Sequence, residues 1–159
     1  MHTGQYQGKA RRICTQCRYI HFVEPRIAVG AMIVESARIL LVQRAFAPEK
    51  GKWCLPAGYL DVGELPEHAV AREVLEETSL NIEVDSLETV FGDASGRGAA
   101  VILVYRARRI SGVLRAADDA ADARFFDLDD LPEIAFPSTH DIVRRALSNA
   151  SVTAPPTAP

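Results

Sequence analysis

The chain has 159 residues, 48% of them apolar and 25% charged, which is the composition of one globular domain with a sizeable core. The net charge of −3 argues against broad binding to nucleic acid or acidic membranes, and no apolar run approaches the length of a bilayer span. The N-terminus lacks the apolar core of a signal peptide, and two of the three cysteines form a Cys-x-x-Cys, so we expect a cytoplasmic protein without a disulfide framework.

The N-terminal half predicts a loose start and then a β-hairpin. Residues 1–12 are polar, and we expect them to be loose, while residues 13–24 hold the cysteine pair. Apolar, β-branched runs predict strands at 27–34 and Arg38–Arg44, with Glu-Ser-Ala turning between them. A loop with Pro48 and Gly51 follows.

The C-terminal half predicts a helix and then mainly strands. Pro66 fits the first turn of a helix that continues to Thr78. Strands are predicted at 81–91, 99–109 and, more briefly, 124–128, with the flexible connection GDASGRG at 92–98. Ser138 is expected to cap a last helix to about Ser148, with Asp141 completing a capping box.

This order of elements predicts an α/β fold, an α/β/α sandwich with a mixed β-sheet. We divide the chain into an N-terminal segment (1–24), a main domain (25–149) and a disordered tail (150–159), the tail being ASVTAPPTAP.

Acidic side chains gather on the helix that follows Pro66. At about 100° per residue, Glu73, Glu76 and Glu77 fall within an arc of roughly 100° on one face. Three hard oxygen donors on one face suit Mg²⁺ or Mn²⁺, which prefer carboxylate, water and substrate phosphate as ligands. Arg72 lies four residues before Glu76 and can pair with a carboxylate to hold it in position. The alternative is a solvated helix face with ordinary Glu/Arg pairs.

The same segment resembles the Nudix signature over a long run of fixed positions. The matching residues are Gly58, Glu64, Arg72, Glu73, Val74, Glu76, Glu77 and Leu80. Ser79 stands where the signature has glycine, a position just after the helix where a left-handed residue is common, so it should cost stability without touching a ligand.

The resemblance covers about 13–138 and is strongest to Nudix pyrophosphatases that act on ADP-ribose and FAD. It implies a Nudix fold and a metal-dependent hydrolase that cleaves the pyrophosphate bond of nucleoside diphosphate derivatives, giving AMP and a second phosphate product. Metal ligands would be Glu73, Glu76 and Glu77, with the Gly58 carbonyl joining them as the resemblance implies. Catalytic roles fall to Glu76 and Glu77, to Arg72 as electrostatic organiser, and to Glu64, which orients the helix or holds a metal-bound water.

The general base is left open at this point. It can be a signature glutamate, or one of three aspartates that precede the 124–128 strand, namely Asp118, Asp119 and Asp122. The alternative for these aspartates is a solubilising loop.

Substrate contacts are predicted at three positions. Arg44 at a strand end and Arg97 in the glycine-rich connection suit phosphate or ribose, and Trp53 can stack on adenine. Core packing or surface charge is the alternative for each of them.

The cysteines Cys14 and Cys17 have the spacing of a zinc knuckle, but a closed site needs four ligands. The resemblance implies a zinc ribbon that here lacks its first pair, so His2, His21 or a second subunit would have to complete it. A degenerate ribbon without metal is the favoured alternative. Other substrates (NADH or dinucleoside polyphosphates) and a non-catalytic ligand sensor are the alternatives to this function. The partners we expect are a small nucleotide and a second copy of the chain in a homodimer, with no nucleic acid or membrane.

Overall fold

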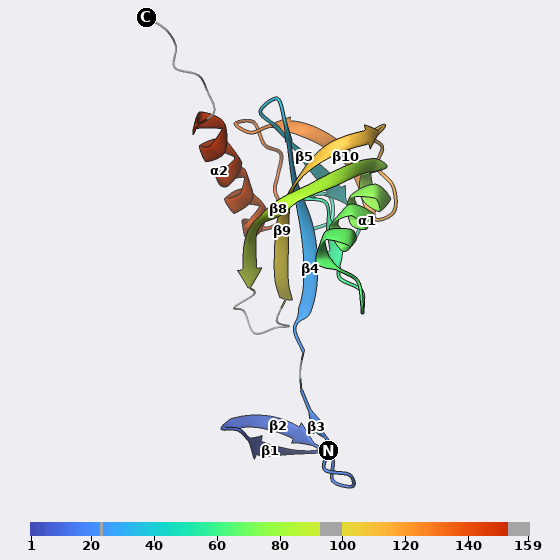
Figure 1. Ribbon diagram of the computed structural model, residues 1–159, viewed down its shortest axis with the longest axis vertical. Coiled ribbons are helices and arrows are strands. Elements are labelled where there is room, and N and C mark those ends of the chain that lie inside the picture. Colours follow the sequence, from blue (N-terminus) through green and yellow to red (C-terminus); the bar gives the residue numbers. More distant parts are fainter. Residues whose placement is uncertain (23, 93–99, 153–159) are drawn as a thin grey trace, which may run out of the picture.

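A mixed seven-stranded sheet forms the centre of the computed structural model, which describes residues 1–22, 24–92 and 100–152 (Figure 1). The strand order is β10-β5-β4-β9-β8, with β6 beside β5 and β7 beside β4. Its strands are β4 (Arg26–Glu35), β5 (Arg38–Arg44), β6 (Trp53–Cys54), β7 (Ala57–Tyr59), β8 (Leu80–Gly92), β9 (Ala100–Gly112) and β10 (Ala120–Asp127). β4 runs parallel to β9, whereas its pairings with β5 and β7 are antiparallel.

Helices α1 (Pro66–Thr78) and α2 (Pro137–Val152) cover opposite faces of this sheet (Figure 1). Side chains alternate along a strand, so β4 supplies both layers. Val29, Ala31 and Ile33 pack with Val70 and Val74 of α1. On the other face, Met32 packs with Ile142, Val143 and Ala146 of α2. The predicted α/β/α sandwich with a mixed sheet is therefore confirmed.

The expectation that residues 1–12 are loose is wrong. They form the hairpin β1 (His2–Tyr6) and β2 (Lys9–Ile13), and β3 (Ile20–His21) adds a third strand. Gln7 and Gly8 both have positive φ, the conformation of a tight hairpin turn. In Figure 1 this small sheet lies apart from the seven-stranded one, beyond the start of β4.

Two later elements are longer than expected. β10 begins at Ala120 rather than at residue 124, because its ladder with β5 extends to Arg44. Helix α2 begins at Pro137, and Asp141 forms an ion pair with Arg144. The same helix continues to Val152, past the expected start of the tail, and residues 153–159 lie outside the described residues. None of the described helices has the length and apolarity needed to cross a membrane.

Candidate active site

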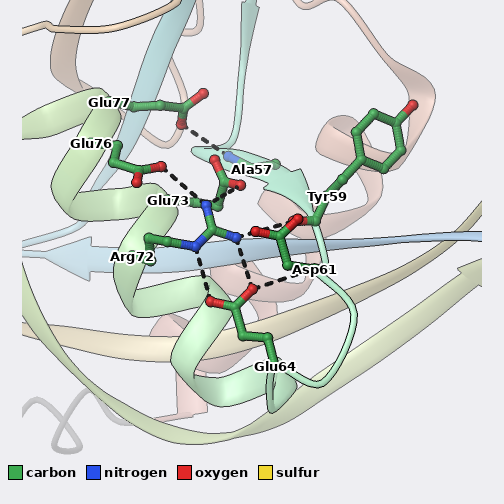
Figure 2. A network of polar contacts seen from close by, with 8 residues as sticks. All are labelled: Ala57, Tyr59, Asp61, Glu64, Arg72, Glu73, Glu76 and Glu77. Atoms are coloured by element: carbon green, nitrogen blue, oxygen red, sulfur yellow. Dashed lines mark hydrogen bonds and ion pairs between the residues drawn. The ribbon is translucent and has the colours of Figure 1, made fainter.

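Helix α1 carries the acidic residues and packs against strand β7, and the sequence of the helix explains this packing. Leu65 precedes the helix in an extended conformation, and Pro66 occupies the first turn, where its missing N–H costs no hydrogen bond. Val70, Val74 and Thr78 are buried against the sheet. This packing turns the carboxylates of α1 towards β7 and the loop that joins the two elements (Figure 2).

One guanidinium organises that loop and the helix. Arg72 donates from Nε and Nη2 to the two carboxylate oxygens of Glu64, both at 2.9 Å. Its Nη1 donates to Glu73 at 2.8 Å and to Glu76 at 3.0 Å, and its Nη2 also donates to the Tyr59 carbonyl at 3.1 Å (Figure 2). These partners raise the pKa of Arg72, and its guanidinium lowers the pKa of Glu64. The contacts of Arg72 are those expected of an electrostatic organiser.

Glycine at position 58 allows Glu73 to lie against the backbone of β7. A Cβ at Gly58 would stand 2.0 Å from the carboxylate carbon of Glu73, so a larger residue does not fit. Burial raises the pKa of Glu73, even though Arg72 acts in the opposite direction. The Gly58 backbone and the Glu73 carboxylate therefore lie together at the centre of the site.

Glu77 points to the other end of β7. Its side chain accepts a hydrogen bond from the Ala57 N–H at 3.0 Å, and only 5% of the residue is exposed. Burial, and then the neighbouring Asp119, raise the pKa of Glu77 to about 9. Glu77 is thus a buried carboxyl beside the exposed Asp119, and Arg72 contacts the other glutamates rather than these two residues.

The three candidate aspartates have different positions. Asp119 reaches Glu77 and lines the same narrow cleft, which also includes Arg44 and Cys54. Asp122 bonds to the N–H of Ala123 at 2.8 Å and pairs with Arg124, and Asp118 is in a left-handed conformation. Only Asp119 of the three is brought to the glutamates by the contacts of the described residues.

A divalent metal fits the chemistry of this donor set. In the conformation described, no group of three or more His, Cys, Asp or Glu side chains among the resolved ranges already converges as a metal site. The reason is visible in Figure 2, where Arg72 holds Glu73 and Glu76 while Glu77 turns to Ala57. The oxygens are nevertheless hard donors, and a bound cation would favour the ionised form of Glu77, the carboxyl that burial and Asp119 otherwise keep protonated.

The three predicted substrate contacts have different outcomes. Arg44 stands at the Glu77 cleft, where its Nε donates to the Pro48 carbonyl at 2.7 Å and its guanidinium lies 5.1 Å from the Phe136 ring centroid. Trp53 is only 8% exposed and packs edge-on against Phe126 in the core, so the structure does not present it to a ligand. Arg97 lies outside the described residues.

Sequence reasoning missed one residue beside the site. Tyr59 follows Gly58 directly, is 54% exposed, and carries the guanidinium of Arg26 over its ring. The signal available was its position, since an aromatic residue next to the signature glycine must lie close to the glutamates.

The Cys14–Cys17 turn offers only two thiols. Backbone N–H groups of Cys17 and Gln16 stabilise the Cys14 thiolate and lower the pKa of Cys14. No third and fourth ligand meets them among the residues that the structure describes, and a zinc site there is not supported.

Residues 24–147 match the NUDIX domain model. The chain belongs to the Nudix family. This Nudix chain is 41% identical over 121 residues to an ADP-ribose pyrophosphatase of Methanocaldococcus jannaschii, covering 75% of this chain and 72% of that protein. It is 31% identical to the NAD-capped RNA hydrolase NudC of Vibrio atlanticus, covering 86% of this chain but only 49% of NudC.

A solved structure, a NUDIX hydrolase from Nitrosomonas europaea, superposes on this Nudix chain with a TM-score of 0.87 at 29% identity. The superposition covers 96% of this chain and 88% of that one, so it includes most of the first 24 residues. The resemblance that the signature indicated is confirmed, and the protein is a Nudix hydrolase. Enzymes of this family use divalent metals such as Mg²⁺ or Mn²⁺.

Proposed function

We propose that this Nudix hydrolase cleaves the pyrophosphate bond of ADP-ribose or FAD, releasing AMP and a second phosphate product. The observation that carries the proposal is the series of acidic residues along β7: Glu73 lies against Gly58, and Glu77, which accepts from the Ala57 N–H, lies beside Asp119. Such a cluster suits a metal-bound pyrophosphate. The relative named ADP-ribose pyrophosphatase supports the choice of substrate.

Four donors would hold the metal: the Gly58 carbonyl and the carboxylates of Glu73, Glu76 and Glu77. When bound, Mg²⁺ or Mn²⁺ offsets phosphate charge and lowers the pKa of a water molecule. For Glu73 and Glu76 to serve as ligands, they must release part of their contact with Arg72. The bidentate pair between Arg72 and Glu64 does not depend on that release, so Glu64 keeps the guanidinium in place.

The general base that we propose is Asp119. Its carboxylate lies beside Glu77 in the cleft, whereas Asp118 and Asp122 have no contact with the glutamates in the described structure. Asp119 would accept a proton from the attacking water as the water oxygen bonds to one phosphorus, and the second phosphate product would leave with the bridging oxygen and the electron pair of the broken P–O bond. Arg44, in the same cleft, would contact a substrate phosphate.

Two other functions are alternatives to hydrolysis of ADP-ribose or FAD. The relative named NAD-capped RNA hydrolase supports NADH as an alternative substrate, and dinucleoside polyphosphates are a second alternative. A sensor that binds a nucleotide without hydrolysis would also use this cleft. Retention of all four signature glutamates favours the enzyme, because binding alone does not require a hydrolytic metal site.

The test is product analysis of the purified protein with Mg²⁺ or Mn²⁺, using ADP-ribose, FAD, NADH, diadenosine polyphosphates and 8-oxo-dGTP. We expect AMP from ADP-ribose or FAD, and its loss in Glu77→Gln. Glu83→Gln is the matched control, since Glu83 on β8 pairs with Arg108 on β9, outside the cluster. Tight binding of one compound without any hydrolysis would favour the sensor instead.

Three further proposals concern the chain as a whole. The division into 1–24, 25–149 and 150–159, the cytoplasmic location and the homodimer each remain predictions. Free thiols at all three cysteines are compatible with a reducing compartment. Light scattering of the purified protein would test the dimer.

A further inference from the structure

A pocket of about 500 Å³ lies beside the catalytic loop and has no role in the function proposed above. Its walls are the start of β4, with Arg26 and Ile27, and the segment from Tyr59 to Glu64. The volume is within the range of small-molecule sites, roughly 300–1,000 Å³. This pocket is separate from the narrow cleft that contains Arg44, Glu77 and Asp119.

An aromatic ring and a cation form one wall of the pocket. The Arg26 guanidinium lies 5.0 Å from the ring centroid of Tyr59, and Tyr59 is largely exposed. Arg26 forms no ion pair with any residue that the structure describes. A flat ring next to a cation with unused N–H donors is a combination that binds a nucleobase and the phosphate attached to it.

Strand β7 connects this pocket to the glutamates. Its three residues contact the cluster one after another: the Ala57 N–H bonds to Glu77, Gly58 lies against Glu73, and the Tyr59 carbonyl accepts from Arg72. Two residues of strand span about 7 Å. The pocket therefore opens at the Arg72 end of the cluster, while the Arg44 cleft opens at the Glu77 end.

We propose that this pocket binds the second nucleoside of a dinucleotide, with its base on Tyr59 and its phosphate near Arg26. Asp61, which also lines the pocket, can accept hydrogen bonds from ribose hydroxyls. With its pyrophosphate at the glutamates, the substrate would place this second nucleoside in the 500 Å³ pocket, on the Arg72 side of the cluster. The inference rests on the proposed function and narrows it, since diphosphates with an aromatic base at each end would bind more tightly than those with a base at one end only.

Diadenosine diphosphate and ADP-ribose provide a matched comparison, because they share one half and differ in the other. Binding is measured by calorimetry with Mg²⁺ in the hydrolysis-deficient Glu77→Gln protein. We expect Tyr59→Ala, added to that background, to weaken binding of the dinucleotide roughly tenfold and that of ADP-ribose less than twofold. Tyr59→Phe keeps the ring and should bind both normally. Tyr19→Ala removes an exposed tyrosine elsewhere and should change neither affinity.

An equal loss for both ligands, no loss for either, or no binding of the dinucleotide at all would overturn the inference. Tyr59→Ala in the otherwise unchanged enzyme should raise KM for the dinucleotide and leave kcat within twofold, whereas Tyr59→Phe and Tyr19→Ala should leave KM unchanged. Failure of the proposed function is distinguishable, since a protein that hydrolyses nothing can still show the tenfold contrast in binding.

Discussion

The Glu73 carboxylate lies so close to the Cα of Gly58 that only a hydrogen atom fits where a Cβ would stand. A Cβ on Gly58 would lie 2.1 and 2.2 Å from the two carboxylate oxygens of Glu73, in addition to its overlap with the carboxylate carbon. These distances are far below van der Waals contact, so any side chain at position 58 must displace Glu73. The glycine is thus required by a neighbouring functional group rather than by an unusual φ.

Gly58→Ala should lower kcat/KM about 100-fold, because the carboxylate of Glu73 must move away from the backbone of β7. Forcing an atom into this packed position should also cost about 1–3 kcal/mol of unfolding free energy. Steady-state kinetics and urea unfolding measure the two effects. Gly92→Ala is the control, since a Cβ there meets no atom of the described residues within 4 Å. A wild-type rate for Gly58→Ala would contradict the role of this contact.

Ser79→Gly should stabilise the protein by about 0.5–1 kcal/mol and leave activity unchanged. Ser79 closes α1 in the left-handed conformation, with φ of 60°, and its N–H bonds to the Leu75 carbonyl. Glycine adopts this conformation without the cost of a Cβ. Thermal and urea unfolding measure the gain. Ser79→Ala, which keeps the Cβ and loses the hydroxyl bond to the Arg115 carbonyl at 3.3 Å, should be no more stable than the wild type.

The cysteines should differ strongly in alkylation rate at pH 8. Burial raises the pKa of Cys54 to about 11, whereas backbone N–H groups lower the pKa of Cys14. Because the thiolate is the reactive form, Cys14 should react with iodoacetamide well before Cys54. Mass spectrometry of digests over time gives the order. Faster labelling of Cys54 in the folded protein would show that the Arg44 cleft is more open than described.

The metal-free protein should become less stable as the pH rises from about 5 to 9. Glu77 has a folded-state pKa of about 9 and an ordinary value near 4.5 when unfolded, so the folded state holds the extra proton between these values. Stability therefore falls across that window, by an amount on the order of a few kcal/mol. Urea unfolding with a chelator at pH 5, 7 and 9 measures the slope.

Glu77→Gln should flatten that slope, because the amide does not titrate. Glu83→Gln, which alters a surface pair, should keep the slope of the wild type. If Glu77→Gln and the wild type lose stability in parallel, the buried carboxyl of Glu77 is not its source.

Helix periodicity made the core of the site predictable from the sequence. Arg72 and Glu76 are four residues apart on the helix, so their contact follows from local geometry alone. The strand Arg38–Arg44 also has the bounds that its apolar run predicts. Local pattern did not separate Glu76 from Glu77, although the first is half exposed and the second is buried beside Asp119. That difference depends on a loop far along the chain.

The features that sequence reasoning missed all depend on distant partners or on unusual turns. Trp53 was predicted to be a substrate contact, but β10 and α2 bury it. The start of β10, Ala-Ala-Asp-Ala, has low strand propensity and is paired because β5 is already in place. The N-terminal hairpin turns at Gln7–Gly8, a pair with a weaker turn signal than Asn-Gly.

The ladder between β4 and β7 has a consequence for insertions and deletions. It pairs Ala28 with Tyr59 and Gly30 with Ala57, so a shift by one residue would turn Tyr59 to the opposite face and carry the Ala57 N–H away from Glu77. One added or lost residue in β7 would disrupt both the pocket beside Tyr59 and the cleft that contains Arg44. Among variants of this enzyme, insertions and deletions should therefore accumulate in the loop at 45–52, which borders the cleft but is not part of this ladder.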